Sequence, residues 1–114
     1  MKLLNRRNGA VLAGQIERAA TWRARLRGLL GRSGLAGGSA LVIEPCTSIH
    51  TFFMKFSIDA LFLGADGRVI RAIPGLRPWR ATRTYPSAAM VAELPAGTLG
   101  RTGTIEGDLL EFEV

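Results

Sequence analysis

The sequence of 114 residues has one cysteine and one histidine. A single cysteine excludes an intramolecular disulfide, so the fold must depend on its hydrophobic core, as in proteins of reducing compartments. The sequence has no run of about 20 apolar residues, and its basic N-terminal residues lead into no apolar stretch long enough for a signal peptide. We therefore expect a soluble cytoplasmic protein without a membrane span.

The sequence also lacks internal repeats and any segment with the composition of a linker. A chain of this length would bury roughly two-thirds of the surface that its unfolded form exposes, which is enough for one core. We expect a single domain over residues 1–114. The glycine-rich segment 34–39 has no lysine in the position used by phosphate-binding loops, so it is a weak signal for a nucleotide site.

Acidic residues are few, since nine Asp and Glu accompany fifteen Lys and Arg and leave a formal net charge of +6. The excess lies mainly in residues 1–32, where Glu17 is the only acid. Such a surface attracts nucleic acid or an acidic partner, but it can also serve solubility alone. The basic residues of interest here are Arg23, Arg25 and Arg27.

Turn residues at regular spacing predict a chain of short strands. Asn8-Gly9 and Asp66-Gly67 are expected to form hairpin turns, because both residue types accept positive φ. Residues 74–87 contain three prolines and are expected to be irregular. Strands are predicted at 3–5, 10–13, 40–43, 58–63, 68–73, 88–94 and 109–114, with extended chain at 47–54.

Thr21 can cap a helix that ends near Gly31, because apolar residues recur at helical spacing between them. Together the patterns predict an α+β, mostly β fold. We expect a small antiparallel β-barrel or rolled sheet with one short amphipathic helix near residues 21–31.

Residues 44–63 hold the only cysteine and the only histidine within a run rich in apolar and aromatic residues. A thiol, an imidazole, a lysine and a carboxylate cost free energy to bury unless each has a partner. We therefore predict a ligand-binding site at a barrel mouth. Its candidate residues are Cys46, His50, Met54, Lys55, Asp59, Trp79, Arg80 and Glu93.

Cys46, His50 and Met54 follow one another at intervals of four residues. Their donor atoms would suit a soft metal ion, but four residues of a straight strand span about 13 Å, too far to share one ion. A Cys46–His50 nucleophile pair fails the same test, because it needs contact at roughly 3 Å. We expect no metal and no cofactor, and the residues favour a protein without enzymatic activity over an enzyme. A thiol-dependent hydrolase stays open only if the chain kinks after Pro45.

Asp59 and Glu93 place carboxylates in apolar strands. Asp59 either accepts backbone N–H bonds at a turn or bulge, or joins Lys55 and Glu93 in a polar cluster. Glu93 requires a cation, which Arg27 or Lys55 would supply.

Trp79 stands between two basic residues, Arg77 and Arg80. It can stack on the bases of single-stranded nucleic acid while the arginines contact phosphates. It can also form a lid over the barrel, with the arginine stems lying along apolar surface. A lone aromatic residue favours the lid, because nucleic-acid platforms usually contain several.

Five short motifs occur in a specific order: RLRGLLGR at 25–32, IHTFFMKFSID at 49–59, DGRV at 66–69, ELPAG at 93–97 and GD at 107–108. In this order they resemble the DUF192 or UPF0127 family of uncharacterised bacterial and archaeal proteins. The resemblance implies a compact β-rich fold with a short helix, and no established activity, substrate or cofactor. We expect a non-enzymatic module that binds a small polar ligand or a partner segment. The alternative is binding of nucleic acid or an acidic partner through the basic helix and the Trp79 loop.

Overall fold

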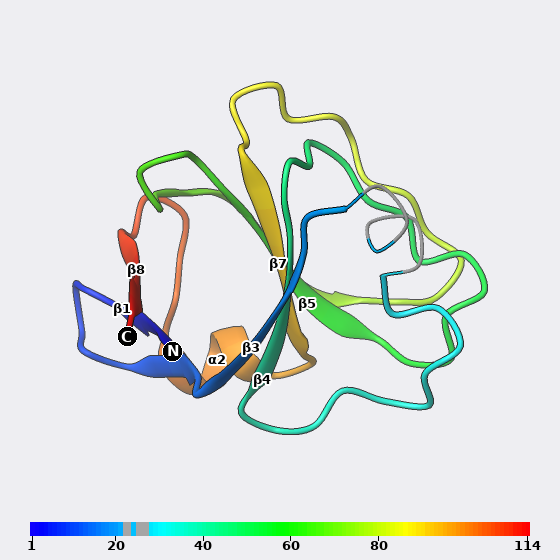
Figure 1. Ribbon diagram of the computed structural model, residues 1–114, viewed down its shortest axis with the longest axis horizontal. Coiled ribbons are helices and arrows are strands. Elements are labelled where there is room, and N and C mark those ends of the chain that lie inside the picture. The colour runs from blue at the N-terminus through cyan, green and yellow to red at the C-terminus, as the bar shows by residue number, and fades with distance from the viewer. Residues whose placement is uncertain (22–23, 25–27) are drawn as a thin grey trace.

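The computed structural model describes residues 1–21, 24 and 28–114 (Figure 1). Its strands are β1 (Lys2–Asn5), β2 (Val11–Ala13), β3 (Gln15–Ala19), β4 (Ser39–Ile43), β5 (Ile58–Leu63), β6 (Val69–Leu76), β7 (Met90–Pro95) and β8 (Leu110–Glu113). They form a three-stranded sheet of order β2-β1-β8 and a five-stranded sheet of order β3-β4-β7-β5-β6. The described residues also include one short helix, α2 (Thr98–Thr102).

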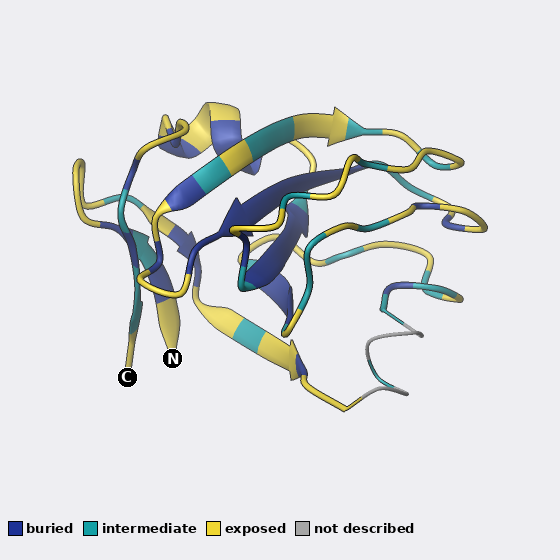
Figure 2. Ribbon diagram, turned by 90° about the horizontal axis from the view of Figure 1, so that it is seen from above, coloured by how far each residue is buried: buried dark blue, intermediate teal, exposed yellow. Residues whose placement is uncertain are grey.

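The five-stranded sheet is buried on both faces at its centre. Every residue of β5 is buried, and in β7 only the last residue is partly exposed. Figure 2 shows these strands in dark blue between the more exposed edge strands β3 and β6. A strand covered on both faces needs apolar residues at successive positions. This explains why β5 and β7 are apolar at every position except Asp59 and Glu93 and the terminal Pro95.

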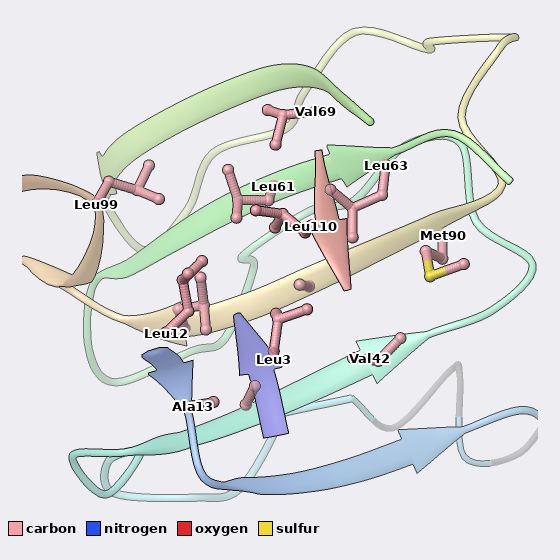
Figure 3. Packing of buried hydrophobic residues seen from close by; sticks show 13 residues of the cluster. Leu3, Leu12, Ala13, Val42, Leu61, Leu63, Val69, Met90, Leu99 and Leu110 are labelled. Atoms are coloured by element: carbon pink, nitrogen blue, oxygen red, sulfur yellow. The ribbon is translucent and has the colours of Figure 1, made fainter. Parts of the chain in front are cut away.

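The three-stranded sheet covers one face of the five-stranded sheet. Leu3, Leu12 and Leu110 from the smaller sheet pack in one cluster with Leu61 and Leu63 of β5 (Figure 3). All five side chains are buried. Because burial of one leucine side chain contributes about 1.5–3 kcal/mol, this cluster holds the two sheets together.

Loops cover the opposite face of the five-stranded sheet. Apolar side chains of β4 and β5 pack there against Leu29, from segment 28–35, and Met54, from segment 46–57. These two segments therefore form the second covering layer of the sheet. Because they are loops, side chains that do not face the sheet are free to point into solvent.

Both predicted hairpins are confirmed. Strand β1 pairs with β2 across Asn8-Gly9, and β5 pairs with β6 across Asp66-Gly67, both antiparallel. Gly9 has a φ of 73° and Gly67 a φ of 92°. Glycine adopts these angles without the steric cost that a Cβ atom would bring.

The fold class is confirmed at the level of a mostly β protein with one short helix, but the described residues show two sheets and no closed barrel. The arrangement is not purely antiparallel, because β3 pairs in parallel with β4. Segment 47–54 is not a strand and contains only an isolated bridge between His50 and Ala81. Strand β6 continues to Leu76, into the segment expected to be irregular.

The helix predicted near residues 21–31 falls largely outside the described residues. Thr21 Oγ1 accepts a hydrogen bond from the Ala24 N–H at 3.2 Å, as expected of an N-cap. The Gly28 N–H donates to the Ala24 carbonyl at 2.9 Å. Helix α2 was not predicted, because its short sequence of threonines and glycine has low helix propensity.

We predict that Gly67→Ala destabilises the protein by roughly 2–4 kcal/mol, because the residue would be strained at positive φ and would clash. An added Cβ at Gly67 would lie 2.3 Å from the Leu110 carbonyl oxygen. Denaturant unfolding followed by circular dichroism measures the change. The matched control is Gly100→Ala, where no atom lies within 4 Å of the new Cβ. Equal stability of the two variants would contradict the prediction.

Candidate functional site

The eight residues suggested for a binding site lie in three places. Cys46, Met54 and Glu93 lie on the loop-covered face of the five-stranded sheet. Asp59 lies on the opposite face, because it is one position out of phase with the residue of β5 that pairs with Glu93. The remaining four, all exposed, are His50, Lys55, Trp79 and Arg80.

Asp59 is fully buried, and both of its carboxylate oxygens accept backbone hydrogen bonds. The Gly75 N–H donates to Oδ1 at 2.9 Å, and the Leu99 N–H donates to Oδ2 at 2.8 Å. The carboxylate thus connects β5 to the end of β6 and to the start of α2. The expectation that Asp59 accepts backbone N–H bonds is confirmed, and the structure does not bring it together with Glu93.

Glu93 is 3% exposed and lies between Leu41 of β4 and Ala60 of β5. Burial raises the pKa of Glu93 to about 7, although the positive charge of Arg32 opposes the rise. Arg32 itself pairs with the Glu17 carboxylate at 2.5 Å. Within the described part of the chain, no group hydrogen-bonds to the Glu93 carboxylate.

The two partners expected for Glu93 do not appear beside it in the described structure. Arg27 lies outside the described residues. Lys55 is exposed and forms no ion pair with any described carboxylate. Among the described residues, the charge that acts on Glu93 is that of Arg32, which the sequence analysis did not suggest.

The side chains of Cys46 and His50 have different hydrogen-bond partners. Cys46 Sγ lies 3.1 Å from the Ser48 carbonyl oxygen. The His50 ring is stacked on Phe52 with 5.1 Å between ring centroids, and its Nδ1 accepts the Phe52 N–H at 3.3 Å. Among the described residues, no three His, Cys, Asp or Glu side chains lie close enough to hold a metal ion.

Four aromatic rings gather on two neighbouring loops, which we call the aromatic surface: His50, Phe52, Phe53 and Trp79. Phe53 and Trp79 are in contact at 4.6 Å between ring centroids, and Phe52 lies 6.2 Å from Trp79. Trp79 is 56% exposed and Phe53 is 69% exposed. Trp79 is therefore not a lid over the core. Both loops lie at the end of the molecule away from the termini (Figure 1).

Thr51 joins the two loops that carry the rings. Its side chain is buried, and its Oγ1 donates to the Arg77 carbonyl at 2.5 Å and accepts the Arg80 N–H at 2.9 Å. Its own N–H donates to the Arg80 carbonyl at 2.8 Å, and its carbonyl accepts the Trp79 N–H at 3.0 Å. Backbone and side chain of one residue thus fix the conformation of segment 77–80.

Phe53 and Trp79 both adopt the left-handed backbone conformation, with φ of 66° and 64°. For a bulky side chain this conformation costs roughly 1–2 kcal/mol and persists only where surrounding contacts impose it. Thr51 hydrogen-bonds to both loops, and these bonds hold the backbone of Phe53 and Trp79 in this conformation. The two rings in closest contact on the aromatic surface are therefore held in place at an energetic cost.

Basic residues flank the rings and have no acidic partners. Segments 45–58 and 74–92 contain no aspartate or glutamate. The basic residues in them are Lys55, Arg77, Arg80 and Arg83, and none forms an ion pair with a described residue. We call these four residues and the aromatic surface together the aromatic and basic surface.

Six other arginines pair with carboxylates, whereas Arg101 of α2 forms no ion pair with a described residue and contacts the Leu12 carbonyl at 3.5 Å. The shortest of these ion pairs involve Arg32 with Glu17 at 2.5 Å and Arg6 with Glu111 at 2.7 Å. The positive charge of the N-terminal third is therefore largely neutralised where the structure describes it. The six paired arginines are Arg6, Arg7, Arg18, Arg32, Arg68 and Arg71.

A cavity of about 260 Å³ lies between the starts of β3 and β4 and the preceding loop. Its polar lining comes from Gln15, Glu17, Arg32 and Ser39. It contains none of the eight residues that the sequence suggested for a binding site. The cavity and the aromatic and basic surface are thus built from different residues.

These features define a small, mostly β protein of two sheets. The DUF192 family, described as "Uncharacterized ACR", matches residues 3–112 of the chain. The chain is 31% identical to a UPF0127 protein of Thermococcus sibiricus and 33% identical to one of Thermococcus gammatolerans, over 98% of this chain and 75% of each relative. The protein belongs to this uncharacterised family, which confirms the resemblance of its motifs.

Two solved structures share the fold. A protein of unknown function from Novosphingobium aromaticivorans superposes with a TM-score of 0.85 at 21% identity, covering 98% of this chain and 84% of that protein. A proposed transcription regulator from Sinorhizobium meliloti superposes with a TM-score of 0.80 at 25% identity, covering 96% and 89%. No helix among the described residues is long and apolar enough to cross a membrane.

We predict that Glu93→Gln removes a pH dependence of folding stability. The pKa of Glu93 rises from 4.5 to about 7 on folding, so the stability it contributes is complete below 4.5 and is lost as pH rises through about 7. The loss is of order 3 kcal/mol. Gln cannot ionise, so the variant should lose less stability than the wild type between these pH values in urea unfolding. Glu113→Gln, at an exposed carboxylate, is the control, and an unchanged profile for Glu93→Gln would refute the assignment.

We also predict that Thr51→Val destabilises the protein by roughly 1–3 kcal/mol, because it leaves the Arg77 carbonyl and the Arg80 N–H without their partner. Backbone hydrogen exchange should accelerate at Trp79 and Arg80. The control Thr84→Val makes the same chemical change at an exposed position. If both variants unfold at the same denaturant concentration as the wild type, Thr51 does not stabilise the loops.

Proposed function

We propose that this protein is a non-enzymatic binding module that binds nucleic acid through the aromatic and basic surface. One observation carries the proposal. Arg77, Arg80 and Arg83 lack carboxylate partners among the described residues and lie on the same loop as an exposed tryptophan. Nucleic acid offers phosphates for the arginines and base faces for the rings.

The pairing of the arginines supports an anionic ligand at this surface. A paired arginine must give up its carboxylate before it can contact a phosphate, whereas an unpaired one can do so directly. Each phosphate contact releases condensed counterions, which is the main source of affinity in non-specific nucleic-acid binding. A surface without acidic residues also avoids repulsion of the phosphate backbone.

The structural neighbours are consistent with this choice. The protein from Sinorhizobium meliloti that shares the fold is a proposed transcription regulator, which is compatible with nucleic-acid binding. Four of the eight suggested site residues belong to the aromatic and basic surface: His50, Lys55, Trp79 and Arg80. A small polar ligand bound by the other four stays a prediction.

We predict that replacing Arg77, Arg80 and Arg83 together by glutamine weakens binding to a fluorescein-labelled oligonucleotide by roughly tenfold or more at low salt. The slope of log affinity against log salt should fall by about 2, since each phosphate that an arginine neutralises on a single strand contributes about 0.7 to the slope. Fluorescence anisotropy across a salt titration measures both quantities.

The matched control replaces three paired arginines, Arg6, Arg18 and Arg68, by glutamine. It removes the same formal charge from other parts of the surface. If binding is non-specific attraction to net charge, both triple variants lose the same affinity. If the wild type binds no nucleic acid even at low salt, the proposed function is wrong.

A further inference from the structure

We infer that the aromatic and basic surface takes single-stranded nucleic acid, with unpaired bases stacked on Phe53 and Trp79. The inference rests on the nucleic-acid function proposed above and adds the class of ligand. It follows from the exposure of the two rings, from the way their backbone is held, and from the charge around them.

The exposure of the rings indicates that they are not there for the core. Phe53 and Trp79 are among the most exposed large apolar side chains of the described residues, at 69% and 56%. They touch each other at 4.6 Å between centroids with planes inclined by 59°, so neither ring covers the other completely. Each ring therefore leaves apolar surface in contact with water, and stacking a base on it would bury that surface.

The fixed backbone favours a preformed site. Both rings start from a left-handed backbone, and the fully buried Thr51 connects the loops that carry them. Side chains ordered before binding lose less conformational entropy when a ligand arrives. The strain of two bulky residues is easier to explain by the need to present their rings than by the stability of the fold.

The stacking surface extends beyond these two rings. Phe52 lies 6.2 Å from Trp79, and His50 is stacked on Phe52 at 5.1 Å. This is the row of several aromatic residues that nucleic-acid platforms usually contain and that the sequence did not reveal. In a duplex the base faces are already covered by neighbouring base pairs. Rings can stack only on unpaired bases, so the row selects single strands.

The charge of the surface selects among possible occupants. A second copy of this chain would bring four positive charges against four of the same sign, which is unfavourable at an interface. An anionic membrane would also attract the basic residues and accept the rings, but it offers no planar groups to stack on an ordered row of rings. The positive charge and the row of aromatic rings together favour single-stranded nucleic acid. Anionic vesicles test the alternative of a membrane ligand.

The experiment compares five probes of the intact protein at the same low salt concentration. Four are labelled 12-residue oligonucleotides: an oligo-dT strand, an oligo-U strand, a duplex, and an abasic strand that keeps the phosphates but lacks bases. The fifth is a vesicle of phosphatidylserine and phosphatidylcholine. Fluorescence anisotropy gives the affinity for the oligonucleotides, cosedimentation gives vesicle binding, and tryptophan fluorescence reports stacking. The variants are Trp79→Ala, Phe53→Ala and Trp79→Phe, with Ile105→Ala as control for the loss of an exposed apolar side chain elsewhere.

We expect a base-containing single strand to bind more tightly than the abasic strand and the duplex. It should quench the tryptophan fluorescence of the wild type but not that of Trp79→Phe, in which Trp22 is the only tryptophan. Trp79→Ala and Phe53→Ala should each weaken that binding between about fivefold and a hundredfold, the range found for loss of a stacking aromatic. Both should leave binding of the abasic strand unchanged. Trp79→Phe should retain most of the affinity, and Ile105→Ala all of it. The ratio between oligo-U and oligo-dT shows whether RNA or DNA is preferred.

Three results would overturn the inference, and they differ from failure of the proposed function. Equal binding of abasic and base-containing strands would show that only phosphates are recognised. Tighter binding of the duplex would show that the rings do not select unpaired bases. Vesicle binding that depends on Trp79 and Phe53, without a preference for bases, would identify a membrane-binding surface. The first two results leave nucleic-acid binding intact, whereas absence of binding to every oligonucleotide refutes both proposals.

Discussion

The structure depends on the burial of β5 and β7 on both of their faces. Two buried strands that are apolar apart from one carboxylate each must be covered from both sides, and the chain covers the two faces with different kinds of structure. One cover is the three-stranded sheet, and the other is a layer of loops. A loop layer can turn some side chains inward, as with Met54, and leave the adjacent Phe53 in solvent. The aromatic surface is thus a consequence of covering a sheet with loops.

The parts of the fold that could be predicted are those determined by residues close together in the sequence. Asn8-Gly9 and Asp66-Gly67 set their own turns, and the strands that they connect are confirmed. Strand β3 could not be predicted, because a polar edge strand is defined by its pairing with β4. Segment 47–54 looked extended from its composition, but hydrogen bonds between Thr51 and residues far along the chain determine its shape. Such contacts leave no periodic pattern in the sequence.

The two buried carboxylates show the same limit for the site. Asp59 and Glu93 both stand in buried strands, and the sequence suggested one polar cluster for them. The register places the two carboxylates on opposite faces of the sheet, and they differ in whether hydrogen bonds compensate their burial. Backbone N–H groups satisfy both oxygens of Asp59. Within the described residues, the charge of Arg32 alone opposes the effect of burial on Glu93, so the pKa of Glu93 rises. The spacing of residues along the chain does not predict whether a buried carboxylate receives backbone hydrogen bonds or is buried without them.

The ion pairs determine which basic residues are available to bind an anionic ligand. A formal charge of +6 directed attention to the N-terminal third, yet the described arginines there are paired with carboxylates. Three of the four described arginines without a carboxylate partner lie on the loop that carries Trp79, beside two phenylalanines in solvent, and the fourth is Arg101 of α2. Strained backbone costs stability and exposed rings cost solubility, so neither is expected without a function. Their coincidence on two loops joined by Thr51 is the reason to assign them a common role in binding.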